Sequence, residues 1–384
     1  MLKLGSYKLN RAKETGDDWV FLIDKTIQMG PDKCLAIAGV RLSKLRQNNL
    51  TLSHNDLEPL VVNISQSCPG EKVYEALKEA QSKTGKAPCQ ILSDGGTDLL
   101  RGIRMFVEEN NTTHHSYDIT HKLALLMKDE FGQNNLWDEF RKSSIDLTQK
   151  IKLSPIAHLA PPRLRPKSSI LNLRHFIRWG FKLLQFVKTR SGLPMEDKFV
   201  SDTCGWIIPY EEFLAEALQI VEIADATKVL VHKRGYRVAT MDDFKKITSL
   251  KTLYPRAKRF AEGVEDFLKS QCSHIPLDEF RLGSTDVLES VFGKFKGIEG
   301  QYANEGFTAL VGVLPVLMAP TTEQEIIAAL SETTVKKIRE KWGENGSGGN
   351  YLAKRRADLT NKNIKDHDFK FYLFQEEISE LKMA

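Results

Sequence analysis

The chain is poor in cysteine and has no long hydrophobic run. Five cysteines, at positions 34, 68, 89, 204 and 272, are spread over 384 residues without a C-x-x-C pair. This spacing excludes a zinc ribbon and is not typical of a disulfide scaffold, so we expect reduced, mostly buried thiols. The longest apolar stretch, Phe307 to Pro320, is too short to span a bilayer and contains Pro315. The first residues lack the apolar segment of a signal peptide, so we expect a soluble cytoplasmic protein without a membrane partner.

Neither hydrophobic nor charged residues are scarce overall. The proportions, 41% hydrophobic and 27% charged, are those of a globular protein and exclude a disordered or fibrous chain. The length suits roughly two to three domains, or one domain with a large insertion. A net charge of +5 is too small to indicate a polyanionic partner by itself.

The first 131 residues combine strand-like and helical patterns. Apolar runs typical of strands are Trp19–Asp24, Cys34–Leu42, Leu60–Ile64, Gln90–Ser93 and His115–Tyr117. Helical periodicity is found in Glu71–Ser82, Thr97–Glu109 and His121–Phe131. The resulting order, β-β-β-α-β-α-β-α, is that of ribonuclease-H-like domains. We therefore expect an α/β fold with a mixed sheet, in which three antiparallel strands precede parallel βα units.

Helical patterns dominate from residue 132 to 276, which we interpret as an all-α insertion. The predicted helices are Trp137–Thr148, Leu171–Lys188, Glu211–Val231, Met241–Leu250 and Ala257–Ser270. The α/β domain should resume over residues 277–342, with Arg281–Phe295, an apolar stretch at 306–319, and a helix from the capping box at Thr322 to about Lys341. Residues 343–350 (GENGSGGN) predict a flexible linker, and a charged tail follows to residue 384.

Two aspartates each end an apolar run. Asp24 follows the first predicted strand and Asp94 the fourth. These strands are neighbours in the expected sheet, so the two carboxylates should face each other, and a divalent cation would resolve their repulsion. A third acid is expected from a later helix, and Glu289 in GSTDVLESVFGKFK (283–296) is the best candidate. Ordinary turn and surface roles are the alternative, which the three positions together disfavour.

The strings LIDKTIQMG, ILSDGGTDLLRG, YDITHKLA and STDVLESVFGKFK resemble the catalytic core of DDE transposases, especially those of bacterial insertion sequences. The resemblance extends from about residue 17 to 320, and it implies that Asp24, Asp94 and Glu289 bind two Mg²⁺ ions, which Mn²⁺ could replace. Asp94 and Glu289 are 195 positions apart (289 minus 94), which suits transposases with a helical insertion. The implied activity is DNA cleavage and strand transfer of a mobile element.

The same resemblance implies partners and a location. The substrates would be double-stranded DNA of the element ends and of the target, bound by a homodimer or higher oligomer in the bacterial nucleoid. The alternatives are a ribonuclease-H-like nuclease without strand transfer, and a truncated or inactive remnant that only binds DNA. Only 23 residues precede Asp24, too few for the helix-turn-helix region that usually reads terminal repeats. Either coding sequence precedes this start, or the element is truncated, or the insertion and the tail recognise the ends.

A fourth match lies after the fifth predicted strand. Asp118-Ile-Thr-His121 resembles the (Cys/Asp)-x-x-His signature of transposases with such insertions. The resemblance implies that His121 lies near the scissile phosphate, where a proton donor or shuttle is useful, with Asp118 beside it. A histidine that merely begins a helix, and an aspartate that merely caps it, are the alternatives.

Positive charge is concentrated in one stretch. Residues 147 to 195 contain no Asp or Glu but ten Lys or Arg, at positions 150, 152, 163, 165, 167, 174, 178, 182, 188 and 190. Because phosphate neutralisation dominates DNA affinity, this stretch predicts a DNA-binding surface. The candidate DNA-binding residues are Arg163, Arg165, Lys167, Arg174, Arg178 and Lys182, with Lys294 and Lys296 after Glu289.

A second basic set lies between residues 228 and 259. Its members are Lys233, Arg234, Arg237, Lys245, Lys246, Lys251, Arg256, Lys258 and Arg259. This set could extend the DNA track, although a solvated helix face is the alternative for both sets. We expect Trp137, Trp179 and Trp206 to pack in a core rather than to stack on bases.

Overall fold

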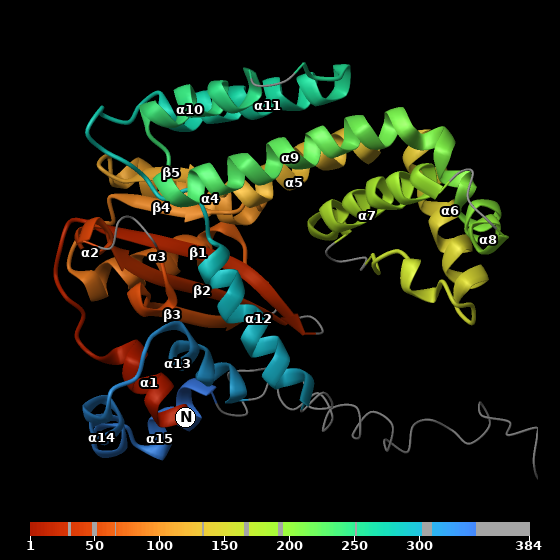
Figure 1. Cartoon of the computed structure of the whole chain (residues 1–384). Coiled ribbons are helices and arrows are strands. Elements are labelled where there is room, and N and C mark those ends of the chain that lie inside the picture. The colour runs from red at the N-terminus through yellow and green to blue at the C-terminus, as the bar shows by residue number, and fades with distance from the viewer. Residues whose placement is uncertain are drawn as a thin grey trace, which may run out of the picture.

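One mixed sheet of five strands organises the α/β part of the chain (Figure 1). The computed structural model describes residues 1–29, 32–47, 52–65, 67–132, 134–164, 169–190, 195–249, 252–301 and 309–342. The strands are β1 (Trp19–Met29), β2 (Asp32–Arg41), β3 (Glu58–Ser65), β4 (Gln90–Ser93) and β5 (His114–Tyr117). Their order across the sheet is β3-β2-β1-β4-β5, with β1, β2 and β3 antiparallel and β1, β4 and β5 parallel. The predicted combination of antiparallel and parallel strands is confirmed.

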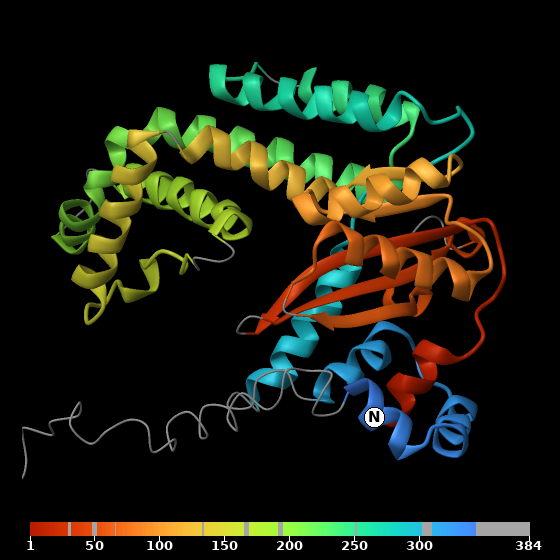
Figure 2. The same ribbon diagram turned by 180° about the vertical axis from the view of Figure 1, so that it is seen from behind.

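Helices cover both faces of this sheet. The helices α3 (Gly70–Thr84) and α4 (Thr97–Glu109) lie on one face of the sheet, which is the near face in Figure 2. The other face carries α1 (Leu2–Asn10), α12 (Asp286–Gln301) and α13 (Leu314–Met318). Side chains alternate between the faces, as in any strand: Phe21 and Ile23 pack toward α3 and α4, whereas Val20 and Leu22 pack toward α12. We call these elements, with α2 (Leu42–Gln47), α14 (Glu323–Glu332) and α15 (Val335–Trp342), the sheet part.

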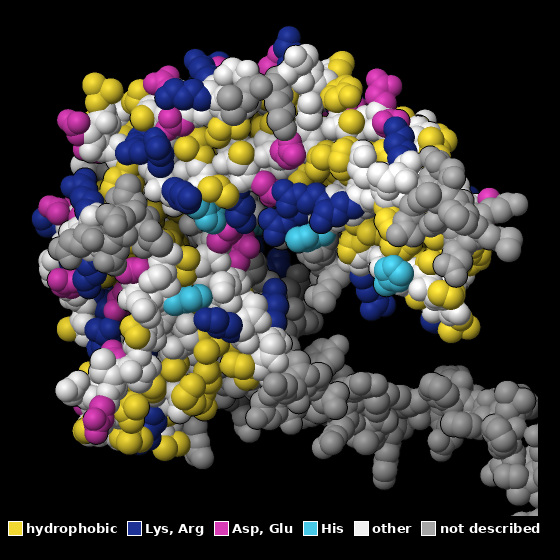
Figure 3. All heavy atoms as spheres, in the orientation of Figure 1, with side chains coloured by type: hydrophobic (Ala, Val, Ile, Leu, Met, Phe, Trp, Pro, Cys, Tyr) yellow, Lys and Arg dark blue, Asp and Glu magenta, His cyan; other side chains and the backbone are white. Residues whose placement is uncertain are grey.

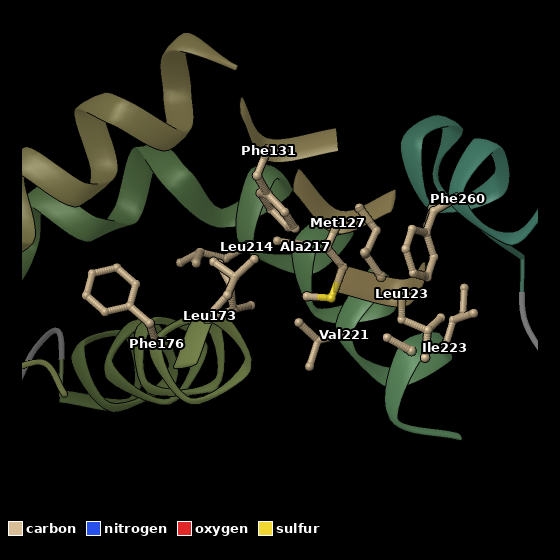
Figure 4. Close-up of a cluster of buried hydrophobic side chains, with 14 of the residues drawn as sticks. Leu123, Met127, Phe131, Leu173, Phe176, Leu214, Ala217, Val221, Ile223 and Phe260 are labelled. Carbon is tan, nitrogen blue, oxygen red and sulfur yellow. The ribbon is translucent and has the colours of Figure 1, made fainter. Parts of the chain in front are cut away.

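Among the described residues, seven helices between β5 and α12 form the helical part of the chain. They are α5 (Ile119–Gly132), α6 (Asn135–Ile151), α7 (Ser169–Arg190), α8 (Met195–Cys204), α9 (Glu211–Arg234), α10 (Val238–Ser249) and α11 (Pro255–Cys272). Short 3₁₀ turns are His54–Asp56, Ala157–Leu159, Gly205–Tyr210 and Ala309–Val313. The helical part has a hydrophobic cluster of its own, running from Ile119 to Ile275 (Figure 4). The sheet part has two further clusters, one on each face of the sheet.

Aromatic rings fill the far end of the helical part. The ring of Phe140 lies 5.5 to 6.4 Å from its aromatic neighbours, measured between ring centroids. These neighbours include Trp137, Trp179 and Trp206. The prediction that the three tryptophans pack in a core is confirmed, since each contacts the cluster of the helical part.

Most predicted elements are present, but the last predicted helix is wrong in its extent. The helix predicted to run from Thr322 to about Lys341 is interrupted, because Thr333 is extended and ends α14. The capping box itself is confirmed: Thr322 Oγ1 accepts a hydrogen bond from the Glu325 amide, and the Glu325 carboxylate accepts one from the Thr322 amide. The predicted linker and tail, and residues 306–308 of the apolar stretch, lie outside the described residues.

The cysteines are in the state that the sequence predicts. All five cysteines are free, and all except Cys89 are buried, as expected for reduced thiols. Among the described residues, no helix combines the length and the apolar character that crossing a membrane requires.

Candidate functional site

Three aspartates lie at the same level of three neighbouring strands. The parallel pairing aligns Ile23 of β1 with Ser93 of β4, and Ser93 with Tyr117 of β5. The residues that follow these three are Asp24, Asp94 and Asp118. Since Leu22 and Leu92 pack toward α12, the period of two places Asp24 and Asp94 on that same face. The predicted juxtaposition of Asp24 and Asp94 is therefore a consequence of strand register.

Asp24 is buried and incompletely hydrogen-bonded. Its side chain is 2% exposed, Oδ1 accepts a 2.5 Å hydrogen bond from the Lys25 amide, and Oδ2 has no hydrogen-bond partner among the described residues. A bulge follows at once: Asp24 pairs with Ala36 but Ile27 with Cys34, so β1 carries one extra residue. Burial, and then the charges of Asp94 and Glu289, raise the pKa of Asp24 to about 7. This carboxylate therefore lacks a compensating group, which a bound cation would supply.

Glu289 approaches from α12 and contacts His121 of α5. Leu288, Val291 and Phe292 of α12 are buried in the cluster on that side of the sheet, and Glu289 lies beside them with 29% of its side chain exposed. The Nε2 atom of His121 is 2.8 Å from Oε1 of Glu289. This hydrogen bond is the largest of the effects that raise the pKa of His121 to about 9. At neutral pH, His121 is therefore protonated and donates to Glu289.

Asp118 fixes the beginnings of two helices. Its Oδ1 accepts a 2.8 Å hydrogen bond from the His121 amide in the first turn of α5. Its Oδ2 accepts from both the amide and the hydroxyl of Thr285, at 2.6 and 3.0 Å, just before α12. Burial raises the pKa of Asp118 and these hydrogen bonds lower it, with burial the larger effect. These contacts are those of a helix cap, the alternative given for Asp118. By making them, Asp118 orients both α5, which carries His121, and α12, which carries Glu289.

Asp286 connects α12 to α9, and sequence reasoning did not find this contact. Its carboxylate lies 2.7 Å from Lys228 Nζ and 3.1 Å from His232 Nε2, both on α9. Oδ1 also accepts a 3.0 Å hydrogen bond from the Thr120 hydroxyl. Despite burial, these hydrogen bonds and charges hold the pKa of Asp286 well below its usual range. The only sequence signal was the spacing of Lys228 and His232, which places them one helical turn apart on one face.

The predicted DNA-binding residues on α7 are exposed. Arg174, Arg178 and Lys182 all point to solvent, and the two arginines contact Asp225 of α9. Figure 3 shows Lys and Arg side chains gathered beside acidic ones, where the surface is hollowed between the sheet part and the helical part. Arg163 is exposed in the segment before α7, and Lys294 and Lys296 are exposed on α12. Arg165 and Lys167 lie outside the described residues.

The second basic set has many acidic neighbours. Arg256 contacts Glu130 and Glu216, and Arg259 contacts Glu130. The other ion pairs join Arg234 and Lys246 to Asp243, and Lys245 to Glu265. For these five residues the solvated, internally paired helix face describes the structure better than a DNA track, because carboxylates already compensate their charge. Lys251 lies outside the described residues.

The acidic cluster, formed by Asp24, Asp94 and Glu289, suits a hard cation by its chemistry. Mg²⁺ prefers carboxylate oxygens, and the buried Oδ2 of Asp24 is an oxygen without a partner among the described residues. Within the described ranges, no three His, Cys, Asp or Glu side chains are so arranged that they could hold a metal ion as they stand. Comparison of the chain with protein-family models and with curated proteins gives no match.

Proposed function

We propose that the protein is a DDE-type transposase, a metal-dependent enzyme that cleaves DNA and transfers the cut strand. The observation that carries this proposal is the buried Asp24. Its Oδ2 has no hydrogen-bond partner among the described residues, and its pKa is raised by burial and then by the charges of Asp94 and Glu289. Buried carboxylates without partners are costly, and perturbed carboxyl groups concentrate at functional sites. A divalent cation is the partner that this cluster of like charges favours.

The proposed fold is a ribonuclease-H-like core interrupted by an all-α insertion. The sheet order β3-β2-β1-β4-β5 with its strand directions supports the core, assigned to residues 1–131 and 277–342. The separate hydrophobic cluster from Ile119 to Ile275 supports an insertion over residues 132–276. Because that cluster begins at Ile119, α5 packs with the insertion although it follows directly from β5.

In the proposed site, Asp24, Asp94 and Glu289 hold two Mg²⁺ ions, which Mn²⁺ can replace. When bound, these ions supply Lewis-acid stabilisation of the attacking and leaving oxygens at a phosphodiester. His121 holds the Glu289 carboxylate in place through the 2.8 Å contact between Nε2 and Oε1, and it carries a proton near the reacting phosphate. Asp118 keeps both side chains in register by its hydrogen bonds to the two helix starts.

The proposed reaction has two steps. Water first attacks the phosphorus at an element end, and the broken P–O bond leaves a 3′-hydroxyl and a 5′-phosphate. That hydroxyl then attacks a phosphodiester of target DNA, so a new P–O bond replaces the one that breaks. The exposed cations of α7 and α12 hold the duplex near the acidic cluster. We propose that a homodimer or higher oligomer acts in this way in the bacterial nucleoid.

Nicking of DNA tests the proposal. A supercoiled plasmid carrying the genomic DNA that flanks the coding sequence is incubated with the purified protein and Mg²⁺ or Mn²⁺. Asp94→Asn, Asp24→Asn and Glu289→Gln should each lower the nicking rate at least about 100-fold, because loss of even outer groups around a metal costs about 10- to 100-fold. Binding of the plasmid should change little, because the basic residues remain.

Asp129→Asn is the matched control, since Asp129 is an exposed carboxylate on α5. It should nick at the wild-type rate. An Asp94→Asn protein that nicks as fast as the wild type contradicts the site assignment, and a wild type that binds the plasmid without nicking it contradicts an enzymatic function. A pre-cleaved end incubated with target DNA then separates a transposase, which joins the two, from a nuclease, which does not.

A further inference from the structure

Asp225 of α9 bridges two arginines of α7. Its Oδ1 lies 3.4 Å from Arg174 Nη1, and its Oδ2 lies 2.8 Å from Arg178 Nη2. Arg174 and Arg178 are four residues apart, so their like charges lie on the same side of α7 and repel each other. A carboxylate that presents one oxygen to each guanidinium offers the same contacts as two oxygens of a phosphate. Asp225 thus occupies the position in which a phosphate would bind.

The contact is exposed and therefore exchangeable. The side chains of Arg174, Arg178 and Asp225 are 44%, 45% and 27% exposed. Exposed ion pairs contribute little net stability because water screens them, so a competing anion can replace the carboxylate at small cost. The stretch of chain around the two arginines contains no acidic residue from 147 to 195. Their counter-charge comes instead from a helix distant in sequence.

The surroundings give the Asp225 side chain room to move. A pocket of about 220 Å³ lies between α5, α7 and α9, and Arg174, Asp225 and Lys228 line it together with apolar side chains such as Met127 and Val221. Lys228, three residues after Asp225 on α9, contacts Asp286, which lies about one helical turn from Glu289 on α12. The surface that carries Arg174, Arg178 and Asp225 is therefore continuous with the α12 end of the acidic cluster.

We propose that this surface, defined by Arg174, Arg178 and Asp225, receives the backbone of double-stranded DNA, and that Asp225 is an internal competitor which a phosphate displaces. The inference rests on the DNA partner proposed above and adds a regulatory element to it. In the free protein, Asp225 compensates part of the positive charge on α7 and lowers the affinity for every duplex. DNA that makes enough other contacts overcomes this competition.

Binding of a fluorescein-labelled 30-base-pair duplex, followed by anisotropy in EDTA so that no cleavage occurs, tests the proposal. Asp225→Asn should bind about 3- to 10-fold more tightly than the wild type, because the competitor is neutral while the shape is kept. Arg178→Gln should bind about 3- to 10-fold more weakly. In the Arg178→Gln background, Asp225→Asn should lose most of its effect, since the two residues act through one contact.

Two matched variants separate this contact from general charge effects. Asp242→Asn removes an exposed carboxylate from α10, and Arg104→Gln removes an exposed guanidinium from α4. Each should change the dissociation constant less than about twofold, because surface charges distant from the contact are screened by salt. Asp225→Glu keeps the charge and should bind as the wild type does. Thermal unfolding of every variant verifies that it is folded.

Salt dependence supplies a second readout. The double variant Arg174→Gln/Arg178→Gln should lower the slope of log affinity against log salt by about one to two, one for each phosphate that is no longer neutralised. Equal affinities of Asp225→Asn and Asp242→Asn overturn the role of Asp225 while the DNA partner stands. A wild-type protein that does not bind the duplex overturns both this inference and the proposed function.

Discussion

The sheet part and the helical part hold their charges in opposite ways. In the sheet part, carboxylates such as Asp24 and Asp118 are buried where strands end, and their pKa values are raised by burial. In the helical part, cations such as Arg174 and Arg178 lie on an exposed helix face, while the interior is built from aromatic and aliphatic side chains around Phe140. The difference teaches that a raised carboxyl pKa requires burial, whereas a surface that attracts a polyanion requires exposed charge. The two requirements are met in separate parts of one chain.

The largest effect is expected in the interior of the helical part. Phe140→Ala removes the central ring of the aromatic cluster and should lower the free energy of unfolding by about 4 kcal/mol, as for other buried aromatic residues. Urea unfolding followed by tryptophan fluorescence measures this, since three tryptophans contact the cluster. Leu136→Ala on the same helix is the control, because Leu136 is 48% exposed. Equal losses for both variants would contradict the packing described for Phe140.

A smaller loss is expected where the two parts meet. Asp118→Ala leaves the amides of His121 and Thr285 without their acceptor and should destabilise the protein by about 3 kcal/mol. Asp118→Asn keeps one acceptor oxygen and should recover part of this loss. Thermal unfolding of both variants is the measurement. If Asp118→Ala unfolds at the wild-type temperature, Asp118 does not hold the two helices in place.

Asp24 should oppose stability at neutral pH, unlike the paired charges of the helical part. Because folding raises the pKa of Asp24 to about 7, its bound proton stabilises the fold fully below pH 4, and this contribution is lost as the pH rises through 7. Asp24→Asn should therefore stabilise the metal-free protein at pH 8 by about 2 kcal/mol, less than the full linkage because buried sites relax.

Unfolding in EDTA at pH 8 and at pH 4.5 measures this effect. The gain from Asp24→Asn should nearly disappear at the lower pH, where the wild-type side chain is protonated in the folded state. Addition of Mg²⁺ at pH 8 should stabilise the wild type but not the variant, because binding to the folded state alone shifts the equilibrium. A gain of equal size at both pH values would show that the charge of Asp24 is not responsible.

The smallest effect distinguishes the two basic sets of the helical part. Arg259→Gln should change duplex affinity less than about twofold, because Glu130, whose side chain is only 14% exposed, already compensates Arg259. Arg178→Gln should have the larger effect described above. Titration of both variants with the same duplex compares them directly. A stronger loss for Arg259→Gln would assign the DNA surface to α11 instead of α7.

Local patterns were sufficient for much of the sheet part. The bounds of β4 and α4 agree with those predicted, because a short apolar run, a Gly-Gly pair and a regular apolar face specify them within a few residues. The strand β1 is longer than predicted and continues to Met29, since pairing with β2 extends it past Asp24. The helix α1 was not predicted, and packing against α13 and α14 compensates for its weak pattern.

Contacts between distant residues could not be read from the sequence. His121 and Glu289 are separated by 168 positions, and their hydrogen bond depends on Asp118, which holds the starts of α5 and α12 together. Both basic sets are rich in Lys and Arg in the sequence. Largely buried carboxylates, Glu130 and Glu216, pair with the second set, whereas the more exposed Asp225 pairs with the first. Strand register, by contrast, made Asp24 and Asp94 neighbours in the way their positions at the strand ends predicted.

The contacts around Asp118 have a consequence for how the length of the helical segment can vary. The backbone leaves the sheet at Ile119 and returns at Gly283, and the Ile119 amide donates a 2.9 Å hydrogen bond to the Gly283 carbonyl. The two ends of the helical segment are thus held next to each other by this hydrogen bond, whatever the length of the chain between them. On the proposed assignment of α6 to α11 to an insertion, this junction keeps Glu289 near Asp24 and Asp94 independently of the length of the inserted segment.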